Sequence, residues 1–257
     1  MYNAHKMNPK DNSPDLIFGI KPVLEGIRSG KEFDKILLQK GGQGESFQEL
    51  FAEIRAAGLP FQHVPYQKLN RITRKNHQGV VAFISPVSFQ PFEEVLQMVY
   101  ERGETPLFVA LDRVTDVRNF GAIVRSAEAM GAHGILIPEK GSAQVNGDAV
   151  KTSAGALLRL PISRVRFLKE TFQYLKDSGI QLVGITEKVE KPLSEVDYTI
   201  PTCLIMGSEE DGISPEYLNL TDQNALIPMP GGFDSLNVSV AAGMALYEAA
   251  RQRFKIQ

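Results

Sequence analysis

Short, continuously apolar segments separated by helical patterns constrain the fold of this chain most. Five of them recur in its second part: Leu107–Leu111, Gly134–Ile137, Gln181–Ile185, Thr202–Met206 and Ala225–Ile227. Each is short enough for a strand and lacks the alternation of a strand with one solvated face. Strands that are apolar on both faces are typical of a parallel sheet covered by helices on both sides. We therefore predict an open, mainly parallel α/β sheet.

Polar residues gather in three segments beside these strands, at residues 111–127, 206–212 and 227–240. Because loops at the carboxyl ends of parallel strands face one crevice, we expect the three segments to meet there. Each segment alone is weak evidence for a site. Together they offer a convergent polar set, consisting of Asn119, Arg125, Glu209, Ser235 and Asn237.

The first segment predicts a helix that begins near Asn119 and buries Ile123, Ala127 and Met130. Arg125 follows Asn119 by six residues, which corresponds to about 240° of helical rotation. This rotation takes Arg125 off the buried stripe and toward the protein surface.

The segment Ile227–Val240 combines a Gly231-Gly232 turn with polar residues before a helix of small residues. One interpretation is an ordinary strand-to-helix connection whose Ser or Asn caps the helix. The other is a binding site in which Ser235, Asn237 and free helix-start N–H groups hold an anion or a nucleotide. Capping residues are frequent, so spacing alone favours the first interpretation.

The first part of the chain alternates strand and helix patterns from Leu16 to about Pro86 and predicts a small α/β domain. We assign residues 1–14 to a flexible polar tail, 15–86 to the small domain, 87–105 to a linker with a connecting helix, and 106–257 to the larger domain. The linker segment Ser85–Pro91 is rich in Pro and Ser. The helix within 87–105 could equally be the first helix of the larger domain.

Charge is distributed unevenly: the chain up to Ser88 holds 12 Lys and Arg against 8 Asp and Glu, and the rest holds 16 against 22. A basic leading domain suits docking of nucleic acid, although ordinary scatter between domains explains the difference equally well. Cys203 is the single cysteine and lies in an apolar run, which indicates a buried strand residue and excludes a disulfide framework. With four scattered His, we expect no metal site.

No signal peptide or run of about 18 apolar residues is evident, so we expect a soluble cytoplasmic protein without membrane contact.

Three motifs follow one another along the chain: Asp116-x-x-Asn119-x-Gly121-Ala122-x-x-Arg125, Gly207-Ser-Glu209-x-x-Gly212 and Ser235-Leu-Asn237-Val-Ser-Val-Ala241. In this order they resemble those of the SpoU (TrmH-like) RNA ribose 2'-O-methyltransferases. More loosely, the segments 18–30 and 77–81 resemble the substrate-binding domain of members that modify a guanosine of 23S rRNA. Val117 departs from the family pattern, which has proline there, so the turn loses a preset φ.

The resemblance implies a SPOUT-type fold with a C-terminal trefoil knot, S-adenosylmethionine as methyl donor, and a homodimer with active sites near the subunit interface. It places catalysis at Asn119, Arg125, Glu209 and Asn237. By position, cofactor contacts map to Gly207, Ile227 and Leu236, with Met229 and Ser235 as plausible additions.

The family assigns Arg125 to activation of the ribose hydroxyl. Arginine side chains keep their proton at neutral pH and are poor bases. We expect Arg125 to anchor the target phosphate and stabilise developing alkoxide charge, which leaves the destination of the proton open. Asn119 would orient the substrate or Arg125, and Glu209 would fix Arg125 or the substrate ribose.

For the leading domain we expect RNA contacts from basic residues, namely Lys21, Arg28, Lys31, Arg71, Arg74 and Lys75. The best-supported of these are Arg71, Arg74 and Lys75, close to His77. The leading hypothesis is methylation of a guanosine ribose in 23S rRNA. A tRNA methyltransferase and a catalytically silent RNA-binding or ribosome-assembly factor are the alternatives, and the intact catalytic set argues against the latter.

Overall fold

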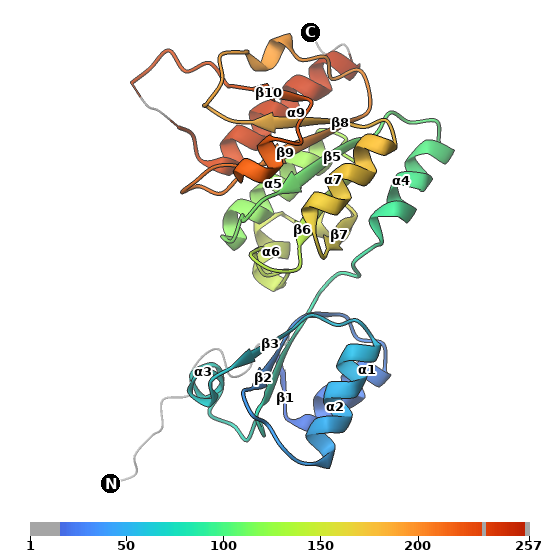
Figure 1. Cartoon of the computed structure of the whole chain (residues 1–257), viewed down its shortest axis with the longest axis vertical. Coiled ribbons are helices and arrows are strands. Elements are labelled where there is room, and N and C mark those ends of the chain that lie inside the picture. The colour runs from blue at the N-terminus through green and yellow to red at the C-terminus, as the bar shows by residue number, and fades with distance from the viewer. Residues whose placement is uncertain (1–15, 233–234, 255–257) are drawn as a thin grey trace. The chain divides into compact units, whose positions relative to one another are not determined.

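The computed structural model describes residues 16–232 and 235–254, and it divides into two compact units whose sequences meet between Ser88 and Phe89. The second unit takes most of the remainder of the chain (Figure 1). The segment assigned to a flexible tail, residues 1–14, lies outside the described residues.

The first unit is a four-stranded mixed sheet in the order β1-β4-β2-β3. Its strands are β1 (Leu16–Phe18), β2 (Phe33–Gln39), β3 (Phe61–Val64) and β4 (Val80–Ile84). The helices α1 (Ile20–Arg28) and α2 (Glu45–Ala56) bury Leu24 and Leu50 on one face, while α3 (Tyr66–Ile72) buries Leu69 on the other. Figure 1 shows α3 on the opposite side of this sheet from α1 and α2.

The second unit contains a six-stranded sheet in the order β10-β8-β9-β5-β6-β7, in which every neighbouring pair is parallel. The strands are β5 (Leu107–Leu111), β6 (Gly134–Pro138), β7 (Ile162–Val165), β8 (Gln181–Ile185), β9 (Thr202–Met206) and β10 (Gln223–Ala225). The predicted parallel α/β sheet is therefore confirmed. The C-terminal knot remains a prediction.

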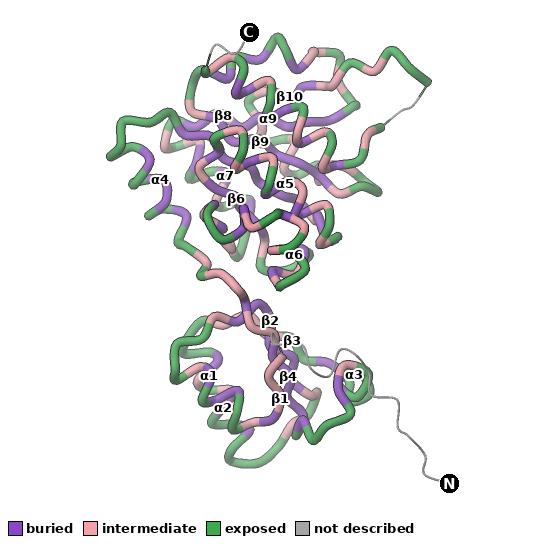
Figure 2. The backbone as a smooth tube through the Cα atoms, turned by 180° about the vertical axis from the view of Figure 1, so that it is seen from behind, coloured by how far each residue is buried: buried purple, intermediate pink, exposed green. Residues whose placement is uncertain are grey.

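Helices cover both faces of this sheet. The helices α4 (Phe92–Glu101) and α7 (Leu168–Asp177) pack on one face, where Phe92 and Phe172 meet Phe108 and Cys203. The helices α5 (Val117–Ala129) and α9 (Val238–Phe254) pack against each other on the opposite face, and short helices α6 (Gly147–Thr152) and α8 (Pro215–Leu218) lie in connections. Buried strands β8 and β9 run through the interior of this unit (Figure 2). Burial on both faces explains why these strands read as unbroken apolar runs.

Two edge strands differ from the sequence prediction. The last strand is Gln223–Ala225 and not Ala225–Ile227, and β7 (Ile162–Val165) was not predicted. Both lie at an edge of the sheet, where one side of the strand has no neighbour and half-buried polar residues such as Gln223 and Arg164 are tolerated. The apolar pattern therefore placed the last strand two residues too late.

The helix in the first polar segment also begins earlier than predicted, at Val117 and not near Asn119. The carboxylate of Asp116 caps this helix by accepting from the N–H groups of Arg118 and Asn119. Ile123 and Ala127 are buried as predicted, whereas Met130 is only half-buried at the helix end. Val117 occupies the first helical position, where proline is also favoured, so the family's proline and this valine suit the same backbone.

The last helix is fastened to the sheet by Arg253. Its guanidinium donates to the carbonyl oxygens of Tyr198, Thr105, Pro106 and Ile200 at 2.6–2.9 Å. Burial lowers the pKa of Arg253 to about 10. These bonds join the C-terminal end of α9 to the segments that enter β5 and β9. The N-terminal end of α9 therefore lies toward the opposite edge of the sheet, where the strands have their carboxyl ends.

Candidate active site

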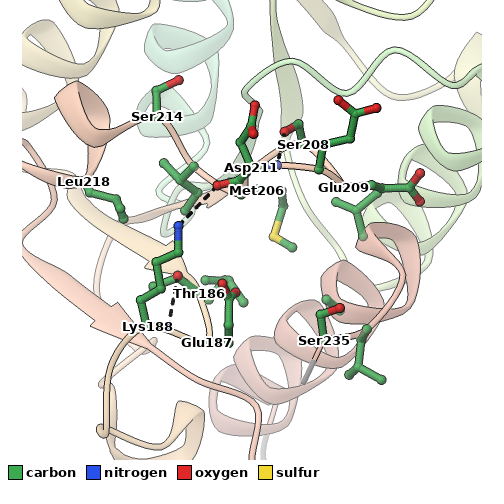
Figure 3. Close-up of a pocket in the computed structure, with 18 of the residues that line it drawn as sticks. Thr186, Glu187, Lys188, Met206, Ser208, Glu209, Asp211, Ser214, Leu218 and Ser235 are labelled. Atoms are coloured by element: carbon green, nitrogen blue, oxygen red, sulfur yellow. Dashed lines mark hydrogen bonds between the residues drawn. The ribbon is translucent and has the colours of Figure 1, made fainter. Parts of the chain in front are cut away.

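A pocket of about 890 Å³ lies at the carboxyl ends of β5, β8 and β9, beside the start of α9. In the view of Figure 3, Lys188 and Ser214 stand on one side of it, and Glu209 and Ser235 on the other. Its apolar lining comes from Ile185, Met206, Ile213, Leu218, Ile227, Leu236 and Val238. Such a concave site with apolar walls and convergent polar groups is typical of a small-molecule site.

The structure brings together all five residues that the sequence assigned to a cofactor. All five line the pocket described above, and they are Gly207, Ile227, Met229, Ser235 and Leu236. They come from the loop after β9, the segment after β10 and the approach to α9. Convergence of these loops follows from the parallel sheet, because the ends of its central strands lie side by side. The role of each residue remains a proposal.

Three of the four catalytic candidates form a hydrogen-bonded triangle at the rim of this pocket. The Nδ2 group of Asn119 donates to Glu209 Oε1 at 2.6 Å, and Nδ2 of Asn237 donates to the same oxygen at 2.7 Å. Asn237 Nδ2 also lies 3.1 Å from Asn119 Oδ1. The triangle joins the start of α5, the loop after β9 and the start of α9, so the three polar segments meet as predicted.

Asn237 serves two purposes at once. Its side-chain Oδ1 accepts from the N–H groups of Ser239 and Val240 at 2.9 and 3.4 Å, which caps α9. Its Nδ2 group is directed to the triangle described above. Both interpretations of the segment before α9 are therefore compatible, since the cap itself orients the amide toward Glu209.

Arg125, the fourth candidate, stands apart from the triangle within a single chain. It is exposed on α5 and is not among the residues that line the pocket. Within residues 16–232 and 235–254, its guanidinium has no hydrogen bond or ion pair, and Glu209 contacts the two asparagines instead. Its neighbour Ser126 lies close to Gly243 of α9, so Arg125 is adjacent to the α5–α9 contact. An exposed guanidinium without a partner is available to an external anion.

Asp112 and Arg113 support the site, and the sequence analysis gave them no role. Asp112 is buried and accepts from Ser214 N and Oγ at 2.7 and 2.6 Å. Arg113 donates to both Asp112 and Asp211, and also to the carbonyl of Gly212 at 3.1 Å. The carboxylate of Asp112, more than that of Asp211, raises the pKa of Arg113. This network fixes the loop after β9 to the end of β5. The sequence feature that could have predicted it is the position of Asp112 directly after an apolar run.

A fourth loop, which the sequence analysis also missed, completes the pocket. Thr186, Glu187 and Lys188 follow β8 directly and line the side away from the triangle (Figure 3). Lys188 Nζ donates to the carbonyl of Asp211 at 3.3 Å and so bridges the loops after β8 and β9. The same rule that singled out the other loops applies here, because Gln181–Ile185 was a predicted strand.

The loop after β9 turns so tightly that one position excludes any side chain. A Cβ atom on Gly207 would lie 2.0 Å from the carbonyl carbon of Gly212 and 2.1 Å from the nitrogen of Ile213. Ser208 and Gly212 exchange two backbone hydrogen bonds at 3.0 Å, and Gly212 has a φ of +72°. The motif glycines are therefore required by the path of this loop, which carries Glu209.

In the first unit, the basic residues assigned to RNA differ in their surroundings. Lys21, Arg71 and Arg74 are exposed, and so is Lys75, whose ammonium lies 5.6 Å from the centre of the Phe18 ring. Arg28 is exposed as well, but its guanidinium pairs with Glu49 and Glu53 at 2.8 and 3.2 Å. Its charge is compensated within the unit, so we expect Arg28 to contribute least to RNA binding. Lys31 is exposed, like the other basic residues of this set.

His77 is a structural residue beside this basic group. Its side chain is 2% exposed, Nδ1 accepts from Gly79 N at 3.0 Å, and Nε2 lies 3.0 Å from Asn70 Oδ1. Burial lowers the pKa of His77, which favours the neutral ring. The ring therefore orders the turn between α3 and β4 and does not offer a charge to RNA.

Comparison with known proteins decides the family. Residues 106–247 match the SpoU rRNA Methylase family, and residues 16–90 match the RNA 2'-O ribose methyltransferase substrate binding family. This chain belongs to the SpoU methylase family. Members use S-adenosylmethionine, and the chain is an RNA ribose 2'-O-methyltransferase.

Three proteins illustrate the similarity. YacO of Bacillus subtilis, named for the TrmH family of tRNA/rRNA methyltransferases, is 32% identical over 93% of this chain and 96% of its own length. An AdoMet-bound rRNA methyltransferase from Sinorhizobium meliloti is 27% identical, with a TM-score of 0.56, over 92% of this chain and 87% of its own. A TrmH/SpoU tRNA modifying enzyme from A. aeolicus is 36% identical, with a TM-score of 0.54, over 63% of this chain and 84% of its own.

The pocket of this SpoU family member suits the chemistry of the cofactor. S-adenosylmethionine combines an adenosine, a cationic sulfonium, and an amino acid end that carries an α-ammonium and an α-carboxylate. Apolar walls such as Ile227 and Leu236 suit the adenine, and the carboxylates that line the pocket, from Glu187, Glu209, Glu210 and Asp211, favour a cation. Among the described residues, no group of His, Cys, Asp and Glu could hold a metal ion, and no helix could span a membrane.

Proposed function

We propose that this methyltransferase modifies the ribose 2'-hydroxyl of a guanosine in 23S rRNA. The supporting observation is that the rRNA methyltransferase from Sinorhizobium meliloti aligns with 92% of the chain, whereas the tRNA enzyme from A. aeolicus aligns with 63%. A substrate-binding unit at residues 16–90 is thus part of the comparison with an rRNA enzyme. The segments 18–30 and 77–81 in this unit carry the resemblance to enzymes of 23S rRNA.

In this proposal, the residues of the pocket align the reactants. S-adenosylmethionine supplies a methyl group on a sulfonium, and transfer to a ribose oxygen requires an in-line approach. Gly207, Ile227 and Leu236 hold the adenosine, and Glu209 lies at the rim where the ribose arrives. Asn119 and Asn237 fix the Glu209 carboxylate before the substrate binds, because both donate to its Oε1 atom. Such preorganisation can supply a large part of the barrier reduction.

Arg125 acts on the RNA in this proposal. Its exposed guanidinium binds the phosphate beside the target nucleotide and stabilises the negative charge that develops on the ribose oxygen. Because Arg125 does not line the pocket of its own chain, we propose that it serves the pocket of a second copy in a homodimer. Exposed apolar residues of α9, which packs against α5, support a subunit contact that includes this helix; they are Val240, Met244 and Tyr247.

The first unit supplies RNA affinity through its exposed basic residues. Replacement of Arg71, Arg74 and Lys75 by glutamine is expected to weaken binding to RNA of any sequence. Each lost phosphate contact removes about 0.7–0.9 from the slope of log K against log salt concentration, so we expect the slope to flatten by about 2. Filter binding at salt concentrations from about 50 to 200 mM measures this slope.

The matched control for this prediction keeps the charges. A variant with Arg71→Lys and Arg74→Lys should retain the wild-type slope, because phosphate neutralisation depends on charge and not on the guanidinium. If the glutamine variant showed the wild-type slope, the basic group of the first unit would lie outside the RNA interface.

Methyl incorporation tests the substrate directly. Labelled S-adenosylmethionine is offered with unmethylated 23S rRNA and with unmethylated tRNA in separate reactions, and the modified nucleoside is identified after digestion. We expect label on the ribose of a guanosine in 23S rRNA. Label in tRNA alone would retain the chemistry and overturn the proposed substrate. Cofactor binding without label in either RNA would contradict methylation of naked 23S rRNA.

A further inference from the structure

Among the described residues, two cationic side chains line the pocket, those of Arg113 and Lys188. They differ in how far neighbouring carboxylates compensate their charge. Arg113 donates to Asp112 through Nε and Nη2, to Asp211 through Nη1, and to the carbonyl of Gly212 through Nη2. Two carboxylates therefore compensate its charge, and its donors point into the supporting network. Arg113 has little capacity for a ligand.

Lys188 has this capacity. Its side chain is exposed at the rim of the pocket, and in the described part of the chain its ammonium makes one hydrogen bond, to the uncharged carbonyl of Asp211 at 3.3 Å. An ammonium group carries three N–H donors, so two are left for a ligand. No carboxylate in the described part of the chain forms an ion pair with Lys188. Figure 3 shows the side chain directed across the pocket wall toward the loop that contains Asp211.

The remaining charge of the pocket is negative, since its other charged residues are Glu187, Glu209, Glu210 and Asp211. These carboxylates suit the sulfonium and the ammonium of S-adenosylmethionine, and they oppose its α-carboxylate. The carboxylate of the cofactor thus needs a cationic partner in these acidic surroundings. Lys188 is the cation of the pocket lining that has unused N–H donors. We propose that Lys188 binds the α-carboxylate of S-adenosylmethionine and so fixes the amino acid end of the cofactor. This inference rests on the proposed cofactor pocket.

The pairing is tested by removing either the ammonium group of Lys188 or the α-carboxylate of the ligand. Calorimetry measures the affinity of the full-length protein for S-adenosylmethionine and for decarboxylated S-adenosylmethionine, which lacks only the carboxylate. We expect Lys188→Met to weaken S-adenosylmethionine about tenfold and to leave the decarboxylated ligand within about twofold of wild type, because charged hydrogen bonds are the stronger class and tenfold is their usual order. Lys188→Arg keeps the charge and should lose less than about threefold.

A neighbouring lysine provides the control. Lys191 donates to Gln223 at 2.8 Å and does not line the pocket, so Lys191→Met should bind both ligands as wild type does. An unchanged circular dichroism spectrum establishes that Lys188→Met is folded.

Three outcomes contradict the inference in distinguishable ways. Equal weakening of both ligands would mean that Lys188 shapes the loop through Asp211 and does not contact the carboxylate. Unchanged affinity for both ligands would place the carboxylate in solvent or on Arg113. If the wild-type protein bound neither ligand, the proposed cofactor pocket would itself be wrong.

Discussion

Replacement of Arg125 by alanine is expected to lower kcat for methyl transfer by about 10²–10³, the usual cost of losing a group that stabilises developing negative charge. Affinity for S-adenosylhomocysteine should not change, because the proposed partner of Arg125 is the RNA phosphate and not the cofactor. Arg125→Lys keeps the charge and loses the planar two-donor contact to phosphate, so its kcat should be intermediate. Single-turnover assays with saturating RNA separate this effect from RNA binding.

Arg118 is the matched control for Arg125. It lies seven residues earlier on the same exposed side of α5, its side chain is 86% exposed, and its ion contact to Asp116 is long at 3.9 Å. Arg118→Ala therefore removes the same charge from the same helix face, and we expect kcat to remain within about threefold of wild type, as for surface substitutions generally. Near-wild-type turnover in both Arg125 variants would exclude the proposed role.

A mixture of two inactive variants tests whether Arg125 serves the partner's pocket. When Arg125→Ala is mixed with a variant that cannot bind the cofactor, each mixed dimer has one intact pocket faced by one intact Arg125. Activity should then reappear in the mixture. A mixture that stays inactive, although subunit exchange is verified, would place Arg125 and the pocket that it serves in the same chain.

The sequence predicted the central architecture because the central strands are buried on both faces. Gln181–Ile185 and Thr202–Met206 were placed with the bounds that the structure has. The edge strands were less predictable, since polar residues such as Gln223 in β10 and Arg164 in β7 interrupt the apolar pattern. The loops after β5 and β9 and before α9 were predicted to meet, since the ends of parallel strands share one crevice.

Other parts of the site depend on the direction of side chains, which cannot be predicted from the spacing of residues in the sequence. The triangle of Asn119, Glu209 and Asn237 required the loop after β9 to fold back on itself through the Ser208–Gly212 bonds. Arg125 was expected in the same convergent set, with Glu209 as its partner, but Glu209 contacts the two asparagines instead. The 240° rotation noted in the sequence correctly placed Arg125 off the buried stripe. Lys188 was not predicted because it lies outside the three motifs, in the loop after β8.

Replacement of Gly207 by alanine is expected to abolish cofactor binding, with affinity for S-adenosylhomocysteine reduced by at least about 100-fold. The new Cβ would lie 2.0–2.4 Å from backbone atoms of Gly212 and Ile213, and backbone cannot move aside as a flexible side chain can. The Ser208–Gly212 bonds would have to open, which shifts Glu209 and one wall of the pocket. Overpacking of this kind costs about 1–3 kcal/mol, so we expect a decrease of several degrees in the unfolding midpoint.

The control for Gly207 is Gly231, which lies between the pocket residues Met229 and Ser235 in the sequence and has room for a side chain. A Cβ on Gly231 would meet no atom within 4 Å, so Gly231→Ala should retain both affinity and unfolding temperature. Calorimetry and thermal unfolding of the two variants, measured side by side, separate the packing of the loop from the general effect of losing a glycine. Wild-type affinity in Gly207→Ala would show that the loop after β9 can adopt a second path, and the cofactor would then have to be held chiefly by Ile227 and Leu236.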